Sequence, residues 1–225
     1  MSLADLPRLV VFDLAGTTVR DDGQVPAAFA AALHAQGIVV TPEQIVGVRG
    51  ASKKDAIGHF VPEGADHPRR VEEAYRAFQE NLSRLYGGGG ACPIEGAEDA
   101  FAWLRSREVR IAFNTGFDRV ITDLLLSALR WSGLAAAVVC GDDVPQGRPA
   151  PDLILRAMDI AGVRDPLQVA NVGDTTLDLL AADRARVRFN IGVLSGAHER
   201  HRLEKAPHTH LLDHVGELPR LWTRS

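Results

Sequence analysis

The chain has 225 residues and a formal net charge of -4, and 46% of its residues are hydrophobic. This length allows one large domain or a core with a smaller insert, and the charge gives no reason to expect nucleic acid or an anionic membrane as a partner. We expect no membrane span and no signal peptide, because no apolar run is long enough. The two cysteines, Cys92 and Cys140, are expected to be reduced thiols, and these features together favour a cytoplasmic protein.

An apolar run near the start of the chain ends in a carboxylate. Leu9–Phe12 is predicted to be a buried strand, and Asp13 follows it directly. Gly16 and Thr17 come next and are typical of a tight turn. Because ligands bind at the carboxyl ends of parallel strands, Asp13 is the first candidate for a reactive group, with a turn-capping Asp as the alternative.

The interval from residue 24 to residue 92 contains no convincing strand. Apolar residues between 71 and 85 recur at helical spacing, and several prolines suit first-turn positions. We therefore predict an all-helical cap domain over residues 24–92, inserted into a core domain made of residues 1–23 and 93–225. Polar and glycine-rich tethers at the two ends favour a lid that opens and closes over the sheet edge, and a fixed helical subdomain is the alternative.

Apolar runs and helical patterns alternate through the rest of the chain. This alternation predicts an α/β fold, in which helices cover both faces of a parallel sheet. The strands predicted after the insert are Val109–Phe113, Ala136–Cys140, Gln168–Val172 and Val187–Ile191, and the helices are Gly96–Ser106, Arg119–Trp131, Asp152–Ala161 and Leu177–Ala182.

Three further segments contain polar residues suited to a phosphate group and a metal ion. Thr115 and Gly116 follow a predicted strand, where a hydroxyl and open backbone N–H groups can hold phosphate oxygens. Arg148 lies in a proline-rich turn and offers a planar fork for phosphate. Asp174 and Asp178 lie four residues apart and offer oxygen ligands of the kind that Mg²⁺ prefers. The alternatives are ordinary turns, a surface arginine and helix capping.

These motifs, in this order and with a helical insert after the first, resemble the haloacid dehalogenase (HAD) superfamily from Val10 to about Ala197. The resemblance implies a Rossmann-like core with an inserted cap, in which Asp13 attacks phosphorus. It also implies that Mg²⁺ is bound by Asp13, the Ala15 carbonyl and Asp174, with Asp178 either as a further ligand or as a residue that supports Asp174. Catalysis or substrate binding is then expected from Gly16, Thr17, Thr115, Gly116, Phe117 and Arg148.

Two positions point to one branch of this superfamily. Ala15 stands where HAD phosphatases have a second Asp that serves as general acid and base, and Arg148 stands where most of them have Lys. Both features resemble the phosphonoacetaldehyde hydrolase (phosphonatase) branch, which cleaves a carbon–phosphorus bond. That resemblance implies a lysine in the cap that condenses with the substrate aldehyde. The resulting protonated imine then accepts the electron pair that is released when the carbon–phosphorus bond breaks. Gly50 and Lys53 match the spacing of this branch, and cationic neighbours such as Lys54 favour the neutral amine.

Residues expected around the organic part of the substrate depart from this branch. Arg49 replaces its usual Met, Ala56 replaces its usual His, and Phe117 replaces an aromatic hydroxyl. The resemblance therefore implies hydrolysis of phosphonoacetaldehyde or of a related phosphonate, one that is larger or carries another anionic group that Arg49 could meet. Arg49 and Gly50 are expected to bind the substrate.

Several alternatives stay open at this point. Lys53 can bind an anionic group of the substrate that is distant from the transferred phosphoryl group, instead of forming an imine. A HAD phosphatase or phosphomutase acting on a small phosphomonoester is an alternative function, and a non-catalytic protein that binds a phosphate ligand is another. In each case the expected partner is a small phosphorylated or phosphonate molecule, and the family implies a possible homodimer.

Overall fold

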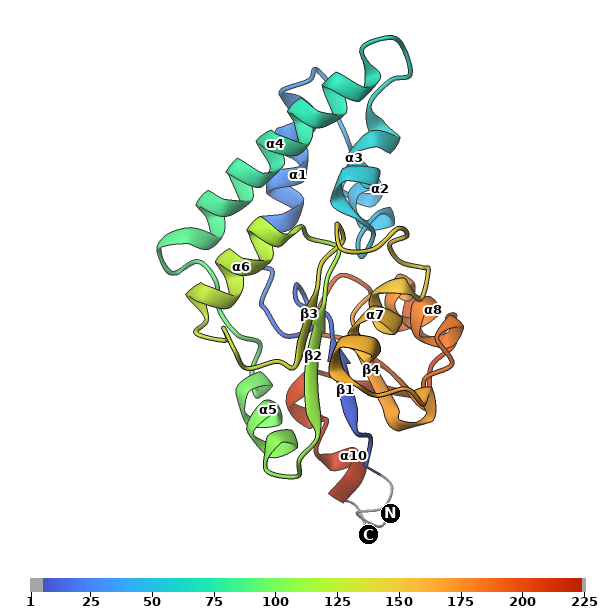
Figure 1. Cartoon of the computed structure of the whole chain (residues 1–225). Coiled ribbons are helices and arrows are strands. Elements are labelled where there is room, and N and C mark those ends of the chain that lie inside the picture. The colour runs from blue at the N-terminus through green and yellow to red at the C-terminus, as the bar shows by residue number, and fades with distance from the viewer. Residues whose placement is uncertain (1–5, 224–225) are drawn as a thin grey trace.

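The computed structural model describes residues 6–223, and all the paired strands of its sheet run parallel. The strands are β1 (Leu9–Phe12), β2 (Arg110–Asn114), β3 (Ala137–Val139), β4 (Val169–Gly173), β5 (Phe189–Val193) and β6 (His210–Leu212). They form a six-stranded sheet in the order β3-β2-β1-β4-β5-β6 (Figure 1). The predicted strands are confirmed with shifts at their ends, and β6 is an edge strand that no apolar run predicts.

Helices cover both faces of the sheet. The face that presents Val10 and Phe12 packs against α5 (Ala97–Arg105), α6 (Arg119–Ala128) and α10 (Arg220–Thr223). The opposite face, with Leu9 and Val11, packs against α7 (Asp152–Ala161) and α8 (Thr176–Arg184). Because both faces are buried, the strands are mostly apolar, with Asn114, Asn171 and Asn190 as buried polar residues, and the predicted α/β fold is confirmed. The short elements are α9 (Arg200–Leu203), η3 (Pro166–Gln168) and η4 (Val215–Glu217).

The segment between β1 and α5 is helical. It contains α1 (Gln24–His34), α2 (Pro42–Gly47), α3 (Lys53–Phe60), α4 (His67–Tyr86) and the short turn η2 (Gly87–Gly89). These helices lie beyond the carboxyl ends of the strands, at the top of Figure 1, with α1 and α4 packed through Phe29 and Phe78, whose ring centroids are 6.2 Å apart. The domain boundaries given above stay a prediction, and residues 1–5 and 224–225 of the predicted core domain lie outside the described residues.

The two connections between the helices and the sheet run side by side. The Arg20 N–H donates to the Cys92 carbonyl at 2.9 Å, and the Ile94 N–H donates to the Thr18 carbonyl at 2.8 Å. A third link joins α4 to the start of α6, where Asp118 accepts hydrogen bonds from the Gln79 amide at 2.7 Å and from the Tyr75 hydroxyl. The helical segment is therefore attached to the core through one narrow pair of connections and through several polar contacts, of which this is one.

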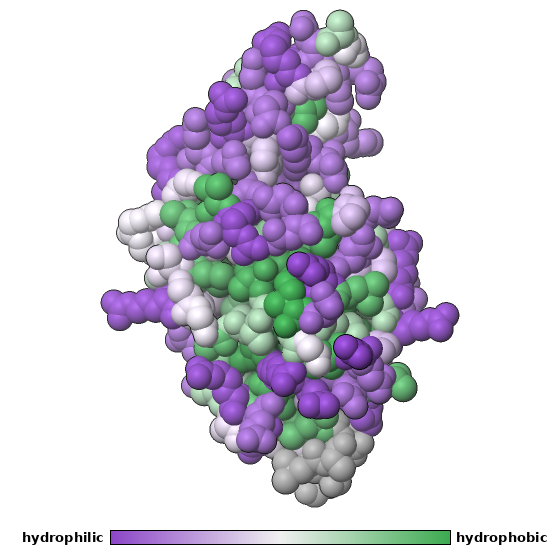
Figure 2. Space-filling view, in the orientation of Figure 1, coloured by the Kyte–Doolittle hydropathy of each residue, from purple (hydrophilic) through white to green (hydrophobic). Residues whose placement is uncertain are grey.

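Hydrophilic side chains cover most of the helical segment, whereas hydrophobic residues gather over the middle of the face seen in Figure 2, where β3 lies in Figure 1. Val120 on α6 and Leu155 on α7 are among the large hydrophobic residues that remain exposed. In the part of the chain that the structure describes, no helix combines the length and apolar character that a membrane crossing requires.

Phe101 on α5 tests the packing of helices on the sheet face that presents Val10 and Phe12. Its ring centroid lies 5.3 Å from that of Phe12, 5.6 Å from that of Phe113 and 5.1 Å from that of Trp131. We expect Phe101→Ala to lower the free energy of unfolding by ~3–5 kcal/mol, because it removes buried contacts and leaves a cavity. Urea unfolding measures this loss. Leu167→Ala, at a position that is 62% exposed, is the control and should change it by less than about 0.5 kcal/mol.

Candidate active site

The loops at the carboxyl ends of the strands and the start of α3 enclose a cavity of about 20 Å³, which is room for about one water molecule. Most of the predicted site residues line it. They are Asp13, Ala15, Arg49, Gly50, Lys53, Thr115, Gly116, Phe117, Arg148 and Asp174. Val25 and Thr175 also line the cavity and are not predicted site residues. Gly16, Thr17 and Asp178 do not line it, although Thr17 donates to Asp174 and Asp178 contacts Arg148.

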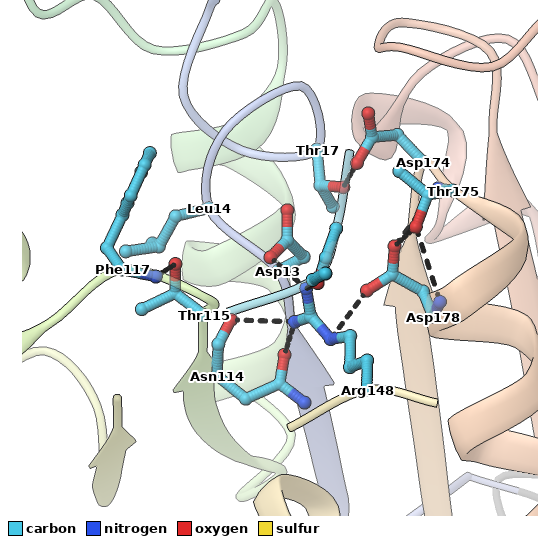
Figure 3. A network of polar contacts seen from close by, with 12 residues as sticks. Asp13, Leu14, Thr17, Asn114, Thr115, Phe117, Arg148, Asp174, Thr175 and Asp178 are labelled. Atoms are coloured by element: carbon cyan, nitrogen blue, oxygen red, sulfur yellow. Dashed lines mark hydrogen bonds and ion pairs between the residues drawn. The ribbon is translucent and has the colours of Figure 1, made fainter. Parts of the chain in front are cut away.

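Arg148 is buried at the centre of the site and holds several loops together (Figure 3). Its Nη1 lies 2.8 Å from Oδ1 of Asp13, and its Nε lies 2.9 Å from Oδ1 of Asp178. Its Nη2 donates to the backbone and side-chain oxygens of Asn114, at 3.1 Å and 2.5 Å. Burying a guanidinium is costly unless it is paired, so these contacts fix one position for the side chain. Asn114 was not among the predicted site residues, although its place at the end of β2 is a signal for it.

Asp13 is held so that one carboxylate oxygen is fixed. Its N–H donates to the Val172 carbonyl at 2.9 Å, and its own carbonyl accepts from the Thr18 hydroxyl at 2.9 Å, so the backbone continues β1 into the site. Oδ1 accepts from Arg148, while Oδ2 has no hydrogen-bond partner among the described residues. Burial raises the pKa of Asp13 to about 6, and the Arg148 guanidinium opposes this shift. Oδ2 is therefore the oxygen available to attack.

Asp178 uses both of its oxygens on neighbouring protein groups. Oδ1 meets Arg148, and Oδ2 accepts from the Thr175 N–H at 3.0 Å and the Thr175 hydroxyl at 2.5 Å. This second set is a capping box that begins α8. With its side chain engaged in this way, Asp178 is placed to orient Arg148. Its predicted role as a metal ligand stays a prediction.

Asp174 faces the cavity without a cationic partner among the described residues. Its Oδ1 accepts from the Thr17 hydroxyl at 3.2 Å, and its Oδ2 accepts from the Ala197 N–H at 2.6 Å. Burial raises the pKa of Asp174 to about 7, and the nearby carboxylates of Asp13 and Asp178 raise it further. The loops pass so close that a Cβ at Gly16 would lie 2.4 Å from Asp174 Oδ2, and Gly16 has a φ of +92°. Because Gly16 has no Cβ, the Asp174 carboxylate can lie this close to the loop that contains Gly16.

The donors in the cavity suit a magnesium ion. Asp13 and Asp174 supply two carboxylates, and Ala15 lines the same cavity and can supply its carbonyl. Residues 6–223 contain no group of three or more His, Cys, Asp or Glu side chains that could enclose a metal ion. Mg²⁺ commonly binds through one or two carboxylates and completes its shell with waters and substrate phosphate oxygens, so these residues fit it. The unpaired carboxylate of Asp174 is the observation that favours a cation here.

Lys53, the first residue of α3, points into this cavity from the helical segment. Its Nζ donates to the Ala51 carbonyl at 3.0 Å and lies 5.4 Å from the centre of the Phe117 ring. Burial lowers the pKa of Lys53 to about 8, and the positive charge of Arg49 adds to this effect. Its neighbour Lys54 pairs instead with Glu72 at 2.5 Å on a half-exposed surface, so only the first of the two lysines belongs to the site.

The loop before α3 is docked tightly on the core. The Lys53 N–H donates to the Gly116 carbonyl at 3.3 Å, and Arg148 Nη1 donates to the Gly50 carbonyl at 3.4 Å. A Cβ at Gly116 would lie 2.5 Å from the Ala51 carbonyl oxygen, and one at Gly50 would lie 2.4 Å from the Thr175 hydroxyl. Because neither glycine has a Cβ, the loop before α3 can lie this close to the core at both positions.

Thr115 and Phe117 form the wall on the β2 side of the cavity. Both are buried, and the Thr115 hydroxyl accepts from the Phe117 N–H at 3.1 Å. The hydroxyl can still donate its own hydrogen to an oxygen in the cavity. Opposite them, Arg49 lines the cavity and pairs with Asp21, a residue that was not predicted for the site.

Comparison with known proteins agrees with this geometry. The model of the haloacid dehalogenase-like hydrolase family matches residues 7–186. The chain is 30% identical over 204 residues to the phosphonoacetaldehyde hydrolase of Bacillus cereus (strain G9842), a match that covers 84% of this chain and 76% of the relative. The chain therefore belongs to the haloacid dehalogenase-like hydrolase family and is an enzyme. Within that family it is phosphonatase-like.

Solved structures share the fold. A hydrolase from Pseudomonas syringae has a TM-score of 0.86 at 24% identity and covers 97% of this chain and 100% of its own. A phosphonoacetaldehyde hydrolase like protein from Oleispira antarctica has a TM-score of 0.85 at 20% identity and covers 96% of this chain and 91% of its own. At these identities the likeness establishes the architecture, including the place of the helices beside the sheet.

Gly116→Ala tests the docking of the loop before α3. The added Cβ would collide with the Ala51 carbonyl, so we expect the Lys53 N–H to lose its hydrogen bond and its amide to exchange with solvent at least ~10-fold faster. Hydrogen–deuterium exchange with mass spectrometry over residues 48–56 measures this. Gly47→Ala is the matched control, since a Cβ there meets no atom within 4 Å. Equal exchange in both variants would contradict the docked arrangement.

Proposed function

We propose that this enzyme is a Mg²⁺-dependent hydrolase of a carbon–phosphorus bond and acts on phosphonoacetaldehyde or a related phosphonate. The observation that supports this most directly is that Lys53 and Asp13 line one cavity, while position 15, an alanine, has no acidic side chain. An amine suits a carbonyl group and a carboxylate suits phosphorus, so the two groups can act on opposite ends of one small molecule. The name of the Bacillus cereus relative supports the same reaction.

The first step concerns the carbonyl group of the substrate. Neutral Lys53 Nζ attacks the carbonyl carbon, one proton is taken up and one water leaves, and a protonated imine forms. Burial and the charge of Arg49 favour the neutral amine that begins this step. The positive nitrogen then lies two bonds from the carbon that holds phosphorus, where it can accept an electron pair.

The second step transfers the phosphoryl group. Asp13 Oδ2 forms a bond to phosphorus as the carbon–phosphorus bond breaks, and the released electron pair moves into the imine to give an enamine. Arg148, whose five N–H groups are all engaged by protein oxygens, holds Oδ1 of Asp13, and the Thr115 hydroxyl faces the phosphoryl oxygens. Asp13, Asp174 and the Ala15 carbonyl would hold Mg²⁺, which would supply charge compensation for the anionic phosphoryl group.

Two waters complete the cycle. The enamine takes a proton on carbon, and water hydrolyses the resulting imine to release the aldehyde and regenerate the Lys53 amine. A second water attacks the phosphorus of the aspartyl phosphate and releases inorganic phosphate from Asp13. All atoms are balanced by substrate and water, and no oxidant or reductant is required.

A small phosphate ester is the second candidate substrate, because the same core can transfer its phosphoryl group. An oxygen leaving group needs a proton, and Ala15 cannot supply one. The Lys53 ammonium lines the cavity and is the group placed for that role. The two candidates differ in whether Lys53 becomes covalently attached to the substrate.

Product release and covalent trapping decide between these reactions. With phosphonoacetaldehyde and Mg²⁺ we expect phosphate and acetaldehyde in equal amounts, and with borohydride a two-carbon adduct on Lys53 by peptide mass spectrometry. Asp13→Asn and Lys53→Arg should each lower kcat by at least ~10³-fold, since neither new side chain can form the required bond. Lys54→Arg, at the exposed neighbouring position, is the control and should keep the rate within about 2-fold. Ester hydrolysis without an adduct would establish the second candidate instead.

The rate of trapping should depend on pH through Lys53. The groups around its amine are Arg49 and Arg148, which disfavour its charge, and Asp13 and Asp174, which favour it. With a pKa lowered to about 8, the amine is mostly protonated below pH 8 and mostly neutral above it. We expect trapping in the presence of a metal chelator to increase with pH around a midpoint near 8. A midpoint near the ordinary value of about 10.4 would contradict the buried position of the amine.

A further inference from the structure

Arg49 lies on the wall of the cavity beside Lys53 and is only partly used by the protein. Its Nη2 contacts Oδ2 of Asp21 at 2.5 Å, and the two side chains are 10% and 2% exposed. This contact is an ion pair that lacks hydrogen-bond geometry, so the five N–H donors of the Arg49 guanidinium make no hydrogen bond within the described residues. Donors that line the cavity therefore remain available to a ligand.

Asp21 fixes the position of this arginine. Its Oδ1 accepts from the Val25 N–H at 3.0 Å in the first turn of α1, while Oδ2 holds Arg49. The pair is therefore anchored to the start of a helix whose Val25 also lines the cavity. Because the pair has no net charge, it acts by presenting directed hydrogen-bond donors, and a planar fork suits a carboxylate.

Two other buried polar atoms, the Tyr86 hydroxyl and Oε1 of Gln24, have no hydrogen-bond partner among the described residues, but neither residue lines the cavity. Oε1 of Gln24 is an acceptor and cannot bind a carboxylate. Among these groups, Arg49 is therefore the one on the cavity wall that can donate to an anionic ligand.

We propose that Arg49, held by Asp21, binds a carboxylate on the carbonyl carbon of the substrate, so that the substrate is a 2-oxo acid with a phosphonate group on carbon 3. This inference rests on the proposed carbon–phosphorus cleavage. Lys53 must reach the carbonyl carbon and Arg49 lines the same cavity, so a carboxylate attached to that carbon lies between the two cationic side chains. The phosphonate then lies at the other end, toward Asp13 and Arg148.

The chemistry stays balanced with this substrate. Lys53 forms an imine at carbon 2, Asp13 takes the phosphoryl group, and the electron pair from carbon 3 moves into the imine. Protonation of carbon 3 and hydrolysis by water release a three-carbon 2-oxo acid, and a second water releases phosphate. A reaction that oxidises or transaminates a 3-carbon aminophosphonate at carbon 2 would supply such a substrate.

Two matched pairs of small molecules test this inference. The reactive pair is 3-phosphonopyruvate and phosphonoacetaldehyde, which differ in the carboxylate, and kcat/KM is compared with Mg²⁺ present. The unreactive pair is 3-phosphonopropanoate and propylphosphonate, whose dissociation constants are measured by calorimetry. We expect the native enzyme to favour the carboxylate member of each pair by ~10- to 100-fold, as expected for charge-assisted hydrogen bonds.

The double variant Asp21→Asn/Arg49→Met removes both charges together, so that no buried charge is left unpaired. The Asn side-chain oxygen can still accept from the Val25 N–H, which preserves the start of α1. We expect the preference within each pair to fall to about 3-fold or less in this variant. Lys54→Met removes a cap charge that pairs with Glu72 and should keep the native preference. Circular dichroism and thermal melting show whether both variants are folded.

The outcomes separate this inference from the proposed function. If phosphonoacetaldehyde is cleaved with a Lys53 adduct but neither pair shows a preference that depends on Arg49, the carboxylate site is overturned and the carbon–phosphorus chemistry stands. If neither phosphonate is cleaved but the unreactive pair shows the preference, the carboxylate site stands and the chemistry fails. If cleavage and preference are both absent, both proposals are wrong.

Discussion

The buried guanidinium of Arg148 is the interaction on which the rest of the site depends. Its side chain is 2% exposed, and a charge at that depth is tolerated only with good partners. Asp13, Asp178 and Asn114 provide them from the ends of β1, α8 and β2, so the parallel order of the strands is what brings the partners together. Because Arg148 also donates to the Gly50 carbonyl, the side chain that orients the nucleophile is in contact with the helical segment. Loss of any one partner would leave a charge or a donor uncompensated, and its effect would extend to the others.

That contact links catalysis to the position of the helices. The cavity has room for about one water molecule, so the proposed reaction would require the helical segment to move before a phosphonate could reach Asp13. The paired connections at residues 18–20 and 92–94 are where we would expect such a movement. In this docked arrangement of the loop before α3, Lys53 is buried, and this burial is the main cause of its lowered pKa. The docked loop therefore supports the neutral amine that the proposed reaction requires.

The sequence predicts a strand of the sheet well where both faces of the strand are buried, because its residues then form a short apolar run. The strands from β1 to β5 are mostly apolar because helices cover both of their faces, whereas β6 is a short, half-buried edge strand with no such run. The carboxylates at the strand ends are equally visible, yet spacing alone could not show that Asp178 gives both oxygens to Arg148 and Thr175. The Asp21–Arg49 pair joins a linker to a loop 28 positions away. No local periodicity relates two such positions, so only the folded chain reveals the pair.

The alanine at position 15 is consistent with the charges of the side chains around it in the site. Asp13, Asp174 and Asp178 already place three carboxylates around one buried arginine, and each of them disfavours further negative charge. A fourth carboxylate at position 15 would stabilise the ammonium form of Lys53, because opposite charge favours the charged state of an amine. It would thereby reduce the fraction of neutral amine that the proposed imine requires. An enzyme that uses an imine as its electron sink has no leaving oxygen to protonate, so it loses nothing when this acid is absent. On this view Ala15 and the buried, partly neutral Lys53 are two parts of one adaptation, and neither would be useful without the other.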